Sequence, residues 1–310
     1  LRRRLIFGKT HKMMQPGAPE PKKKPILVIT SQVVRGGISG RGLTFALERI
    51  GHPVWFLPTI LLPWHPGHGK ATRIVPPSES FNAIAEDLAG SEKLGEIGAV
   101  ISGYLGDADQ AGAIAGLVKA VRTANPGAPY LCDPVMGDHL GESGSLYIPK
   151  ATAQAIRDEL VPLADIVTPN AFELGWLTRR EVESEMQALA AARVLGNERV
   201  LVTSSPALRR NAIANLLAGP RGAVAAEHAA IANPPHGTGD LMAGLFLTNL
   251  MAGCDDEEAL KRASASVFEL VARSVRKGAD ELLFAEEQQS VVKAMALVTS
   301  RRVLEAKARA

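Results

Sequence analysis

One short segment of this chain has the residue types and spacing expected of a phosphate-binding turn. Residues 237–240 read Gly-Thr-Gly-Asp and precede an apolar stretch with helical spacing. Two glycines allow a tight turn in which successive N–H groups converge, and the start of the helix adds its positive dipole end. Such a turn suits a phosphate, or the charge that develops during its transfer. Asp240 would also be an ordinary helix starter, so this segment alone leaves both interpretations open.

Two other segments place polar side chains directly after short apolar runs. Asp133 follows the run 130–132, where a carboxylate can hold Mg²⁺ directly or through water. Further along the chain, Thr168 ends a run, and Asn170 and Glu173 follow it. Their three-residue spacing also fits a capping box in which Asn replaces the usual Ser or Thr. A turn aspartate and a helix start are therefore the structural alternatives.

Three more segments offer hydroxyl or aromatic groups after apolar runs. Ser31 opens a glycine-rich stretch that lacks both the Gly-Lys-Ser/Thr of a Walker A loop and the first glycine of a dinucleotide fingerprint. This favours a small substrate there over a nucleotide. Tyr104 could present its ring to a flat ligand, and Thr203 and Ser204 could donate to phosphate oxygens. Packing and turn roles remain the alternatives.

These segments are spaced along a chain that alternates between two kinds of pattern. Short, continuous apolar runs, typical of strands buried on both faces, lie at 26–30, 54–57, 98–102, 130–132, 166–168 and 200–203. Stretches with helical spacing lie at 43–50, 81–89, 110–122, 151–160 and 186–195. A hairpin is expected at 211–217 and 222–230, and a helical region from about 239 to the end. The pattern predicts an α/β fold with a mostly parallel central sheet flanked by helices, in a single compact domain.

In such sheets, ligands bind at the carboxyl ends of the strands, where the polar segments lie. We expect a basic, unpacked tail over 1–24, a folded domain over 25–285 and a helical extension over 286–310. Met13 and Met14 are alternative starting residues.

Composition narrows the classes of protein. The chain has 310 residues, of which 46% are hydrophobic and 22% charged, with a net charge of +3. No apolar stretch approaches the roughly 18–20 residues that span a membrane. Positive charge is concentrated in 1–24, and the remaining body is mildly acidic, which argues against a nucleic-acid partner. Cys132 and Cys254 make no disulfide framework, which favours a reducing, cytoplasmic location. Cys132 ends an apolar run and is expected to be a buried, unreactive thiol.

The ordered set of these motifs resembles the ribokinase-like superfamily of ATP-dependent kinases, over about residues 26–276. Asp-Pro-Val-Met-Gly at 133–137, Thr-Pro-Asn at 168–170 and Gly-Thr-Gly-Asp at 237–240 carry the resemblance. Within the superfamily the chain is similar to the pyridoxal kinases, on the residues around Ser31, Ser-Gly-Tyr at 102–104 and Cys132 before the aspartate. The resemblance implies ATP-dependent phosphorylation of the 5′-hydroxymethyl group of pyridoxal, in salvage of vitamin B6. Pyridoxine and pyridoxamine are possible further substrates.

The resemblance also implies roles for individual residues. Asp240 would accept the hydroxyl proton and contact substrate, within an anion hole formed by the amides of Gly237, Thr238 and Gly239. Asp133 and Glu173 would govern Mg²⁺ through water and lie at the ATP site. The ATP phosphates would be lined by Thr168, Asn170, Thr203 and Ser204. Ser31 would bind the pyridine ring and Tyr104 would pack near it. The family also responds to a monovalent cation, usually K⁺, and is usually homodimeric.

The chain departs from the family pattern at residues 62–70. A threonine there commonly touches substrate in pyridoxal kinases, whereas this chain has Pro66 at about that place. His65 is the candidate for a replacement contact, with a solvated loop histidine as the alternative. The segment 229–235 is also shorter than in some relatives of the family, so adenine contacts are not assigned.

Two rival functions stay open. Hydroxymethylpyrimidine kinases share the 133–137 and 168–170 patterns but typically carry cysteine where this chain has Asp240. A non-catalytic ligand-binding relative is the second alternative, and the intact Asp240 and Asp133 argue against it.

Overall fold

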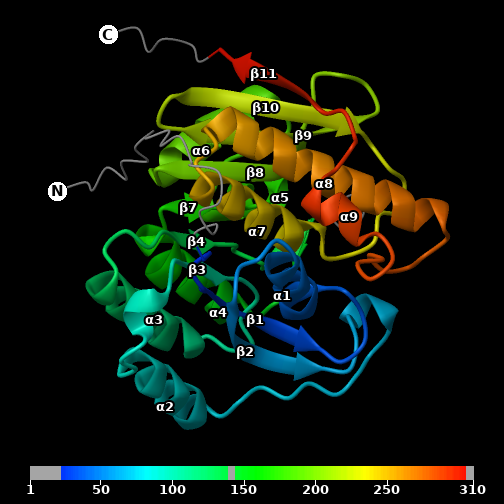
Figure 1. Ribbon diagram of the computed structural model, residues 1–310. Coiled ribbons are helices and arrows are strands. Elements are labelled where there is room, and N and C mark those ends of the chain that lie inside the picture. Colours follow the sequence, from blue (N-terminus) through cyan, green and yellow to red (C-terminus); the bar gives the residue numbers. More distant parts are fainter. Residues whose placement is uncertain (1–21, 139–143, 305–310) are drawn as a thin grey trace, which may run out of the picture.

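A nine-stranded sheet crosses the described part of the chain, residues 22–138 and 144–304 of a computed structural model (Figure 1). Its strands are β1 (Ile26–Val33), β2 (Val54–Leu62), β3 (Ala99–Ser102), β4 (Tyr130–Cys132), β7 (Ile166–Val167), β8 (Arg199–Pro206), β9 (Ala212–Gly219), β10 (Gly222–Ala229) and β11 (Thr299–Val303). Their order is β11-β10-β9-β8-β7-β4-β3-β1-β2. The strands from β2 to β8 pair in parallel, and β9, β10 and β11 add antiparallel pairs. The predicted α/β fold is confirmed.

Helices cover both faces of this sheet (Figure 1). One layer packs against the first core cluster and contains α1 (Ser39–Arg49), α7 (Thr238–Met251), α8 (Asp256–Arg276) and α9 (Gln288–Val292). The other face carries α2 (Ser78–Ala89), α3 (Gln110–Ala124), α4 (Lys150–Ala155) with its continuation Ile156–Leu160, α5 (Ala171–Thr178) and α6 (Glu185–Leu195). A separate two-stranded ribbon is formed by β5 (Gly137–Asp138) and β6 (Ser145–Leu146).

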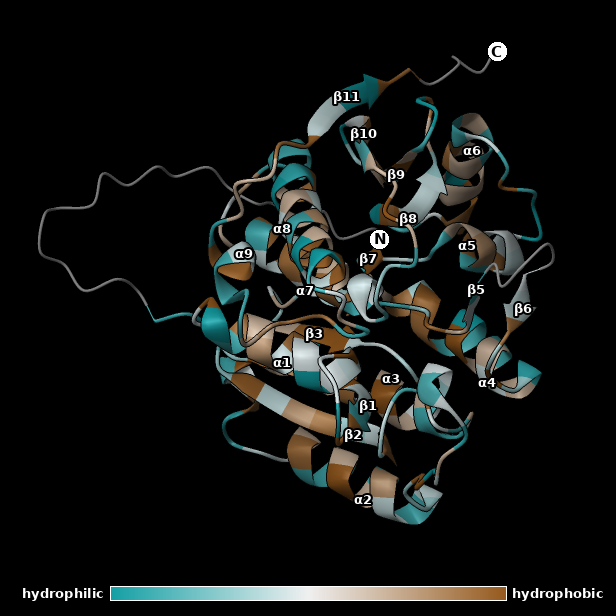
Figure 2. Ribbon diagram, turned by 90° about the vertical axis from the view of Figure 1, so that its right-hand side faces the viewer, coloured by the Kyte–Doolittle hydropathy of each residue, from teal (hydrophilic) through white to brown (hydrophobic). Residues whose placement is uncertain are grey.

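Burial on both faces explains why the strand sequences are continuously apolar. In β1, Ile26 and Val28 pack into the cluster beneath α1 and α7, whereas Leu27 and Ile29 pack into the opposite cluster. The alternation follows from the two-residue period of a strand. Figure 2 shows the same division, with apolar strands inside and helices that are polar on their outer sides.

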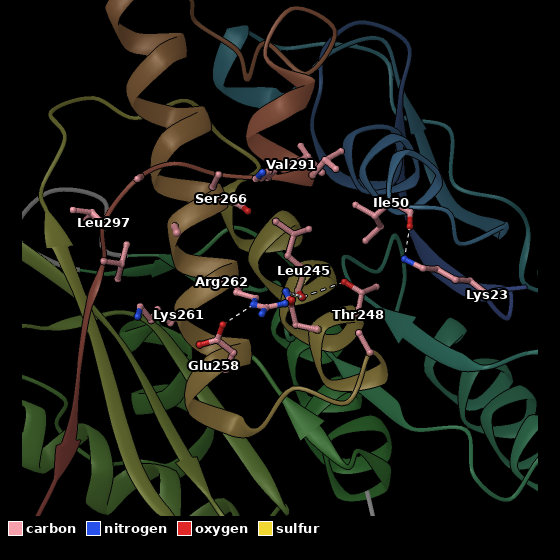
Figure 3. Close-up of a pocket in the computed structure, with 18 residues that line it drawn as sticks. Lys23, Ile50, Leu245, Thr248, Glu258, Lys261, Arg262, Ser266, Val291 and Leu297 are labelled. Carbon is pink, nitrogen blue, oxygen red and sulfur yellow. Dashed lines mark hydrogen bonds and ion pairs between the residues drawn. The ribbon is translucent and has the colours of Figure 1, made fainter. Parts of the chain in front are cut away.

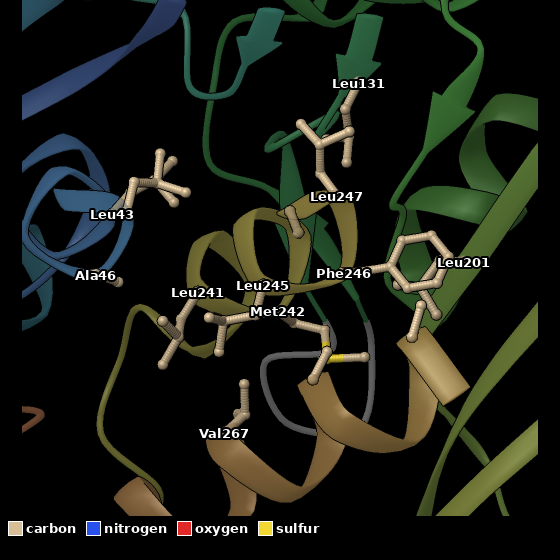
Figure 4. Packing of buried hydrophobic residues seen from close by; sticks show 14 of the residues in the cluster. Leu43, Ala46, Leu131, Leu201, Leu241, Met242, Leu245, Phe246, Leu247 and Val267 are labelled. Carbon is tan, nitrogen blue, oxygen red and sulfur yellow. The ribbon is translucent and has the colours of Figure 1, made fainter. Parts of the chain in front are cut away.

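Helix α7 is buried more completely than the other helices of its layer. Leu241, Phe246 and Leu247 are almost fully buried against the sheet and against α1 and α8 (Figure 4). A helix that is apolar around its whole circumference belongs in the interior, and this burial fixes the position of its first turn. The turn 237–240 is therefore held by the core itself. No helix in the described ranges is long and apolar enough to cross a membrane.

Strand order places the predicted polar segments together. The chain moves from β1 outward to β2, and then returns to β3 on the other side of β1. Such a switch in direction leaves a crevice at the carboxyl ends of the strands. The polar residues predicted after the apolar runs lie in the last part of β1 and β8 or directly after β3, β4 and β7, so they share that edge. Ser31, Thr203 and Ser204 are still within their strands, because β1 and β8 extend beyond the predicted apolar runs.

The helical extension expected over 286–310 is wrong for most of its described part. Helix α9 ends at Val292, and β11 then pairs antiparallel with β10. The reason lies in long-range contacts of Arg301, whose guanidinium bonds the buried carboxylates of Glu185 and Glu227. The expected tail over 1–24 lies outside the described residues except for Lys22, Lys23 and Lys24.

The Arg301 contacts generate a stability prediction. Arg301→Leu should lower the free energy of unfolding by about 2 kcal/mol at pH 7, because it removes the cation that Glu185 and Glu227 share. A fully buried arginine would lose more, but a third of this side chain is exposed. Chemical denaturation at pH 7 and pH 4 would measure the effect.

The neighbouring, exposed Arg302 provides the matched control, and Arg302→Leu should change stability by no more than about 0.5 kcal/mol. Desolvation is the largest influence on Glu227 and raises its pKa, but the hydrogen bond and charge of Arg301, with smaller contributions from Leu208 and Arg209, together lower it below the usual value. A lowered carboxyl pKa gives stability that is lost as pH falls, so the difference from wild type should shrink at pH 4. Equal effects of the two variants at pH 7 would contradict this account.

Candidate active site

Asp240 lies in the first turn of α7, directly after the glycine turn. Gly237 precedes the helix with φ +93°, a left-handed conformation that favours glycine. A Cβ at this position would approach Ile38 to about 3.1–3.3 Å, so the turn also packs closely against the start of α1. The carboxylate of Asp240 is partly accessible yet densely surrounded by protein, and this desolvation raises its pKa to about 6. Hydrogen bonds from Ser39 and from its own N–H limit the rise.

Asp133 and Glu173 form the acidic part of the site with Asp240. Both are buried, with exposed fractions of 6% and 4%. Desolvation raises the pKa of Asp133 well above its usual range, and repulsion from Asp240 and Glu173 adds to the rise. Thr168 donates a hydrogen bond of 3.0 Å to Asp133, and this bond offsets part of the rise in the pKa of Asp133. Desolvation raises the pKa of Glu173 to about 8. Asp133 is therefore the carboxylate that is repelled by both of the others.

Glu173 and Asn170 form the predicted capping box, so the helix-start interpretation holds locally. The side chain of Asn170 accepts from the N–H of Glu173, and Glu173 accepts from the N–H of Asn170, both at 2.9 Å. The box also reaches across to β5. Glu173 accepts from the N–H groups of Met136 and Gly137, and Asn170 donates to the Gly137 carbonyl at 2.8 Å. These residues thus link the segment after β7 to the segment after β4.

The predicted substrate residue Ser31 lies in β1, and Tyr104 follows the neighbouring strand β3, where it is bonded to Thr30 of β1. The N–H of Tyr104 donates to the Thr30 hydroxyl at 3.0 Å, and Thr59 donates to the Tyr104 carbonyl. The Tyr104 hydroxyl accepts from Arg73 at 2.9 Å. Arg73 was not singled out by the sequence, because its closeness to Tyr104 depends on how the segment after β2 folds back.

His65 lies against the residue that precedes the glycine turn. Its ring is 4.1 Å, between centroids, from that of His236. Its Nδ1 accepts from the N–H of Gly67 and starts the short helical turn Pro66–His68. Desolvation, with repulsion from His236 and His68, lowers the pKa of His65 to about 4. His65 is therefore a neutral, partly buried group beside the site, and the solvated-loop alternative is disfavoured.

Thr203 and Ser204 line a cavity of about 100 Å³ together with Thr238 and Gly239. This cavity connects the end of β8 with the glycine turn, as the motif order predicted. Sequence reasoning missed its apolar and aromatic walls, which include Met242, Val267, Val271, Ile213, Ile231, His228 and Phe268. The last two rings pack with centroids 5.0 Å apart. They come from β10 and α8, whose meeting no local spacing reveals.

A second cavity, of about 440 Å³, lies away from these residues (Figure 3). Its walls come from α7, α8 and the segment after α9, and include Leu245, Thr248, Arg262 and Val291. Arg262 is already paired with Glu258 at 2.7 Å. None of the predicted site residues lines this cavity, so its size does not make it the active site.

Cys132 is almost fully buried at the end of β4, and Cys254 is the other free cysteine in the described chain. Burial raises the pKa of the Cys132 thiol to about 12. A thiol that stays protonated is a poor nucleophile, which supports the structural role expected for it.

The donor set suits Mg²⁺ better than a metal held by protein alone. Within residues 22–138 and 144–304, no group of three or more His, Cys, Asp or Glu side chains is arranged to hold a metal ion. Mg²⁺ usually takes one or two carboxylates and completes its shell with water and phosphate. Asp133 and Glu173 fit that arrangement, because their mutual repulsion with Asp240 would be relieved by a cation.

The capping box generates a prediction with a built-in control. Asn170→Ala and Ser184→Ala each remove a side chain that caps a helix, of α5 and α6 respectively. Each should lower the free energy of unfolding by about 1 kcal/mol. Only Asn170→Ala should also raise the KM for ATP, by several-fold, because it releases Gly137 beside Asp133. Denaturation and steady-state kinetics would measure both effects, and equal KM values for ATP in the two variants would count against a role for Asn170 beyond capping.

The chain is similar to known proteins over most of its length. A family model described as phosphomethylpyrimidine kinase matches residues 80–283. The pyridoxal kinase PdxY of Corynebacterium diphtheriae is 36% identical over 275 residues, covering 86% of this chain and 95% of its own length. The PdxY protein of Rubrobacter xylanophilus is 36% identical over 286 residues, covering 90% and 97%.

Solved structures show the same fold. The pyridoxal kinase of Trypanosoma brucei superposes with a TM-score of 0.80 at 25% identity, covering 91% of this chain and 100% of its own. That of Leishmania donovani, in complex with ADP and pyridoxine, superposes with a TM-score of 0.83 at 24% identity, covering 90% and 99%. On the sequence matches, together with the site that the sheet assembles, this chain belongs to the pyridoxal kinase family within the ribokinase-like superfamily.

Proposed function

We propose that this chain transfers the γ-phosphoryl group of ATP to the 5′-hydroxymethyl group of pyridoxal. One observation carries the proposal. The first turn of α7 lies between two sides of the site. On one side, Thr238 and Gly239 line the same cavity as Thr203 and Ser204. The next residue, Asp240, is hydrogen-bonded by Ser39 on the side of β1. A base at this junction lies between a nucleotide and a small alcohol.

The residues supply positioning and charge rather than a covalent nucleophile, as phosphoryl transfer requires. Asp240 takes the proton of the acceptor hydroxyl, and its raised pKa brings it closer to neutral pH than a free aspartate. The amides of Gly237, Thr238 and Gly239 stabilise the charge on the transferred group at the start of α7. Bound Mg²⁺ would offset negative charge on the phosphates, with Asp133 and Glu173 orienting it through water.

The cavity beside the glycine turn supports a place for the nucleotide. Thr203 and Ser204 offer hydroxyl and backbone groups to phosphate oxygens at the end of β8. The apolar walls beyond them, with His228 and Phe268, suit the flat face of an adenine. Thr168 and Asn170 lie on the phosphate side through their bonds to Asp133 and Gly137. The apolar and aromatic residues of this cavity are therefore proposed as the adenine contacts that the sequence alone did not assign.

The pyridine ring is proposed to lie on the β1 side of Asp240. Ser31 would bind the ring, Tyr104 would pack near it, and His65 would contact it in place of the family's threonine. The neutral state of His65 supports that role, because a histidine of low pKa adds no positive charge beside the pyridine ring. Pyridoxine and pyridoxamine are further substrates in this proposal.

Other family properties form part of the same proposal. A requirement for K⁺ and a homodimeric state are carried over from the family resemblance. A cytoplasmic location agrees with the unpaired thiols Cys132 and Cys254.

Hydroxymethylpyrimidine phosphorylation is the second candidate, because the matching family model bears the name of phosphomethylpyrimidine kinase. A coupled ADP-release assay with ATP and Mg²⁺ separates the two. We expect the highest turnover with pyridoxal, and a product that absorbs as pyridoxal 5′-phosphate. Turnover with the pyrimidine alone would overturn the proposed substrate but leave the ATP site intact. No turnover with pyridoxal, pyridoxine, pyridoxamine or the pyrimidine, with K⁺ present, would favour a different alcohol or a non-catalytic protein.

Removing the base gives the next prediction. Asp240→Ala should lower kcat by about 10²- to 10⁴-fold, because a positioned general base contributes on this order. ATP should still bind, which isothermal titration calorimetry would measure. Wild-type kcat should fall as pH drops through about 6, since the protonated carboxyl cannot accept a proton.

An exposed acid in the first turn of another helix provides the control. Glu79→Ala in α2 should leave kcat and its pH profile unchanged. Near-normal turnover in Asp240→Ala would remove Asp240 as the base.

The metal role of Asp133 can be tested through the Mg²⁺ requirement. Asp133→Ala should raise the Mg²⁺ concentration for half-maximal activity by about tenfold or more, because it removes a carboxylate that orients the ion. Asp87→Ala, at an exposed position of α2, should leave the titration unchanged. Identical Mg²⁺ titrations for wild type and Asp133→Ala would contradict the assignment.

A further inference from the structure

Ser39, the first residue of α1, lies between the substrate side of the site and the base. Its hydroxyl accepts a hydrogen bond from Ser31 at 2.7 Å and lies 3.1 Å from the hydroxyl of Thr30. Its backbone N–H and its hydroxyl both bond the carboxylate of Asp240. We propose that Ser39 is a positioning residue that ties Ser31 to Asp240 and thereby fixes how each presents itself to the substrate. This inference deepens the proposed function and rests on it.

The backbone conformation of Ser39 is strained, which argues against a purely structural role for a serine at this position. Its φ is +53°, in the left-handed region where glycine is favoured and most other residues are strained. The residue is also 94% buried, with an exposed fraction of 6%. Glycine would satisfy the same backbone without strain and without a polar group to bury. The hydroxyl is therefore the feature that distinguishes serine from glycine at this position.

Independent geometry places the same groups together. A Cβ added to Gly103, after β3, would lie 2.6 Å from the Thr30 hydroxyl oxygen and 3.7 Å from Oδ1 of Asp240. Both atoms therefore lie against one glycine. The N–H of Tyr104 also donates to the Thr30 hydroxyl. Hydroxyls from β1 and α1 thus connect the segment after β3 with the start of α7.

Each hydroxyl has a single proton, and this determines which group donates in each hydrogen bond of the network. An ionised aspartate only accepts hydrogen bonds, so the single hydroxyl proton of Ser39 points to Asp240. Ser39 then accepts from Ser31, which uses the only proton of that hydroxyl. Ser31 is left with lone pairs to offer the substrate. Its partner must be a donor, and the protonated ring nitrogen of pyridoxal is a group of that kind.

Two substitutions separate the hydroxyl from the backbone. Ser39→Gly and Ser39→Ala both remove the hydroxyl, but only glycine relieves the left-handed strain. Both variants should lose about tenfold or more in kcat/KM for pyridoxal, the loss expected for a hydrogen bond to a charged group. The KM for ATP should stay within about twofold of wild type. The melting temperature should rise in Ser39→Gly and not in Ser39→Ala.

Arg179→Gly is the matched control. Arg179 also has a left-handed backbone, with φ +56°, but lies exposed at the end of α5. This variant should gain stability without any change in kinetics. Wild-type kcat/KM in Ser39→Gly, or a kinetic loss that follows the melting temperature across the two Ser39 variants, would overturn the proposal.

A direct readout tests the direction of the network. The nitrogen-15 chemical shift of labelled pyridoxal, bound without ATP at pH 7.5, should report a protonated ring in wild type. Ser39→Gly frees Ser31 to donate as well as accept, so its bound ring should show a larger unprotonated fraction. An unprotonated ring in wild type would refute Ser31 as an obligate acceptor.

Failure of the proposed function would look different. In that case wild type would phosphorylate another alcohol, or bind pyridoxal without turnover. The three variants would then be compared on that alcohol, or by pyridoxal affinity in titration. A loss shared by both Ser39 variants and absent from Arg179→Gly would still support the link from Ser39 to Asp240, and no shared loss would overturn it.

Discussion

The carboxylate of Glu173 is the contact on which the phosphate side of this site depends. It accepts N–H groups from two separate segments, one after β4 and one after β7. Because backbone N–H groups cannot rotate away, these bonds fix the distance between the two loops. Asp133 and Thr168, which those loops carry, are thereby brought to within hydrogen-bonding distance. Glu173, which the motif suggests as a metal-binding residue, therefore also holds the loops after β4 and β7 together.

Burial of the carboxylates also determines the electrostatic character of the site. Asp133, Glu173 and Asp240 come from three different segments and are each desolvated, which raises all three pKa values. Such an arrangement is costly for a protein without ligands and is relieved by cations. In the proposed function, such a site would bind a divalent ion and a polyphosphate together. The negative charge of the acidic cluster and the positive start of α7 would then balance each other around the transferred group.

Much of this arrangement could be predicted from the sequence. Apolar runs marked β1, β3, β4, β7 and β8, and a parallel sheet requires their carboxyl ends to share an edge. This edge predicts that Asp133 and Glu173 lie close together, and the Gly-Thr-Gly-Asp motif, through the family resemblance, adds Asp240 to them. The capping box at Asn170 was visible too, since its spacing is local.

What the sequence could not give depends on contacts between distant segments. Ser39 looked like one more residue of a glycine-rich loop, because neither its φ nor its bond to Asp240 is written in local spacing. His228 and Phe268 meet only when β10 packs beside α8. The helix expected over 286–310 is wrong at β11, because the pairing of this strand depends on Arg301 reaching two carboxylates that are distant in the sequence.

The two outer strands of the sheet differ in sequence but share a property that bears on aggregation. The outermost strand on one side, β11, carries the exposed Arg302, and a charged side chain on an edge strand disfavours pairing with another sheet. On the other side, β2 contains Pro58, which has no N–H to offer another strand. Each edge is thus a poor template for pairing with a second molecule. Loss of the C-terminal strand would uncover the edge of β10, whose first five residues are all small or apolar, and would leave the carboxylate of Glu227 without Arg301.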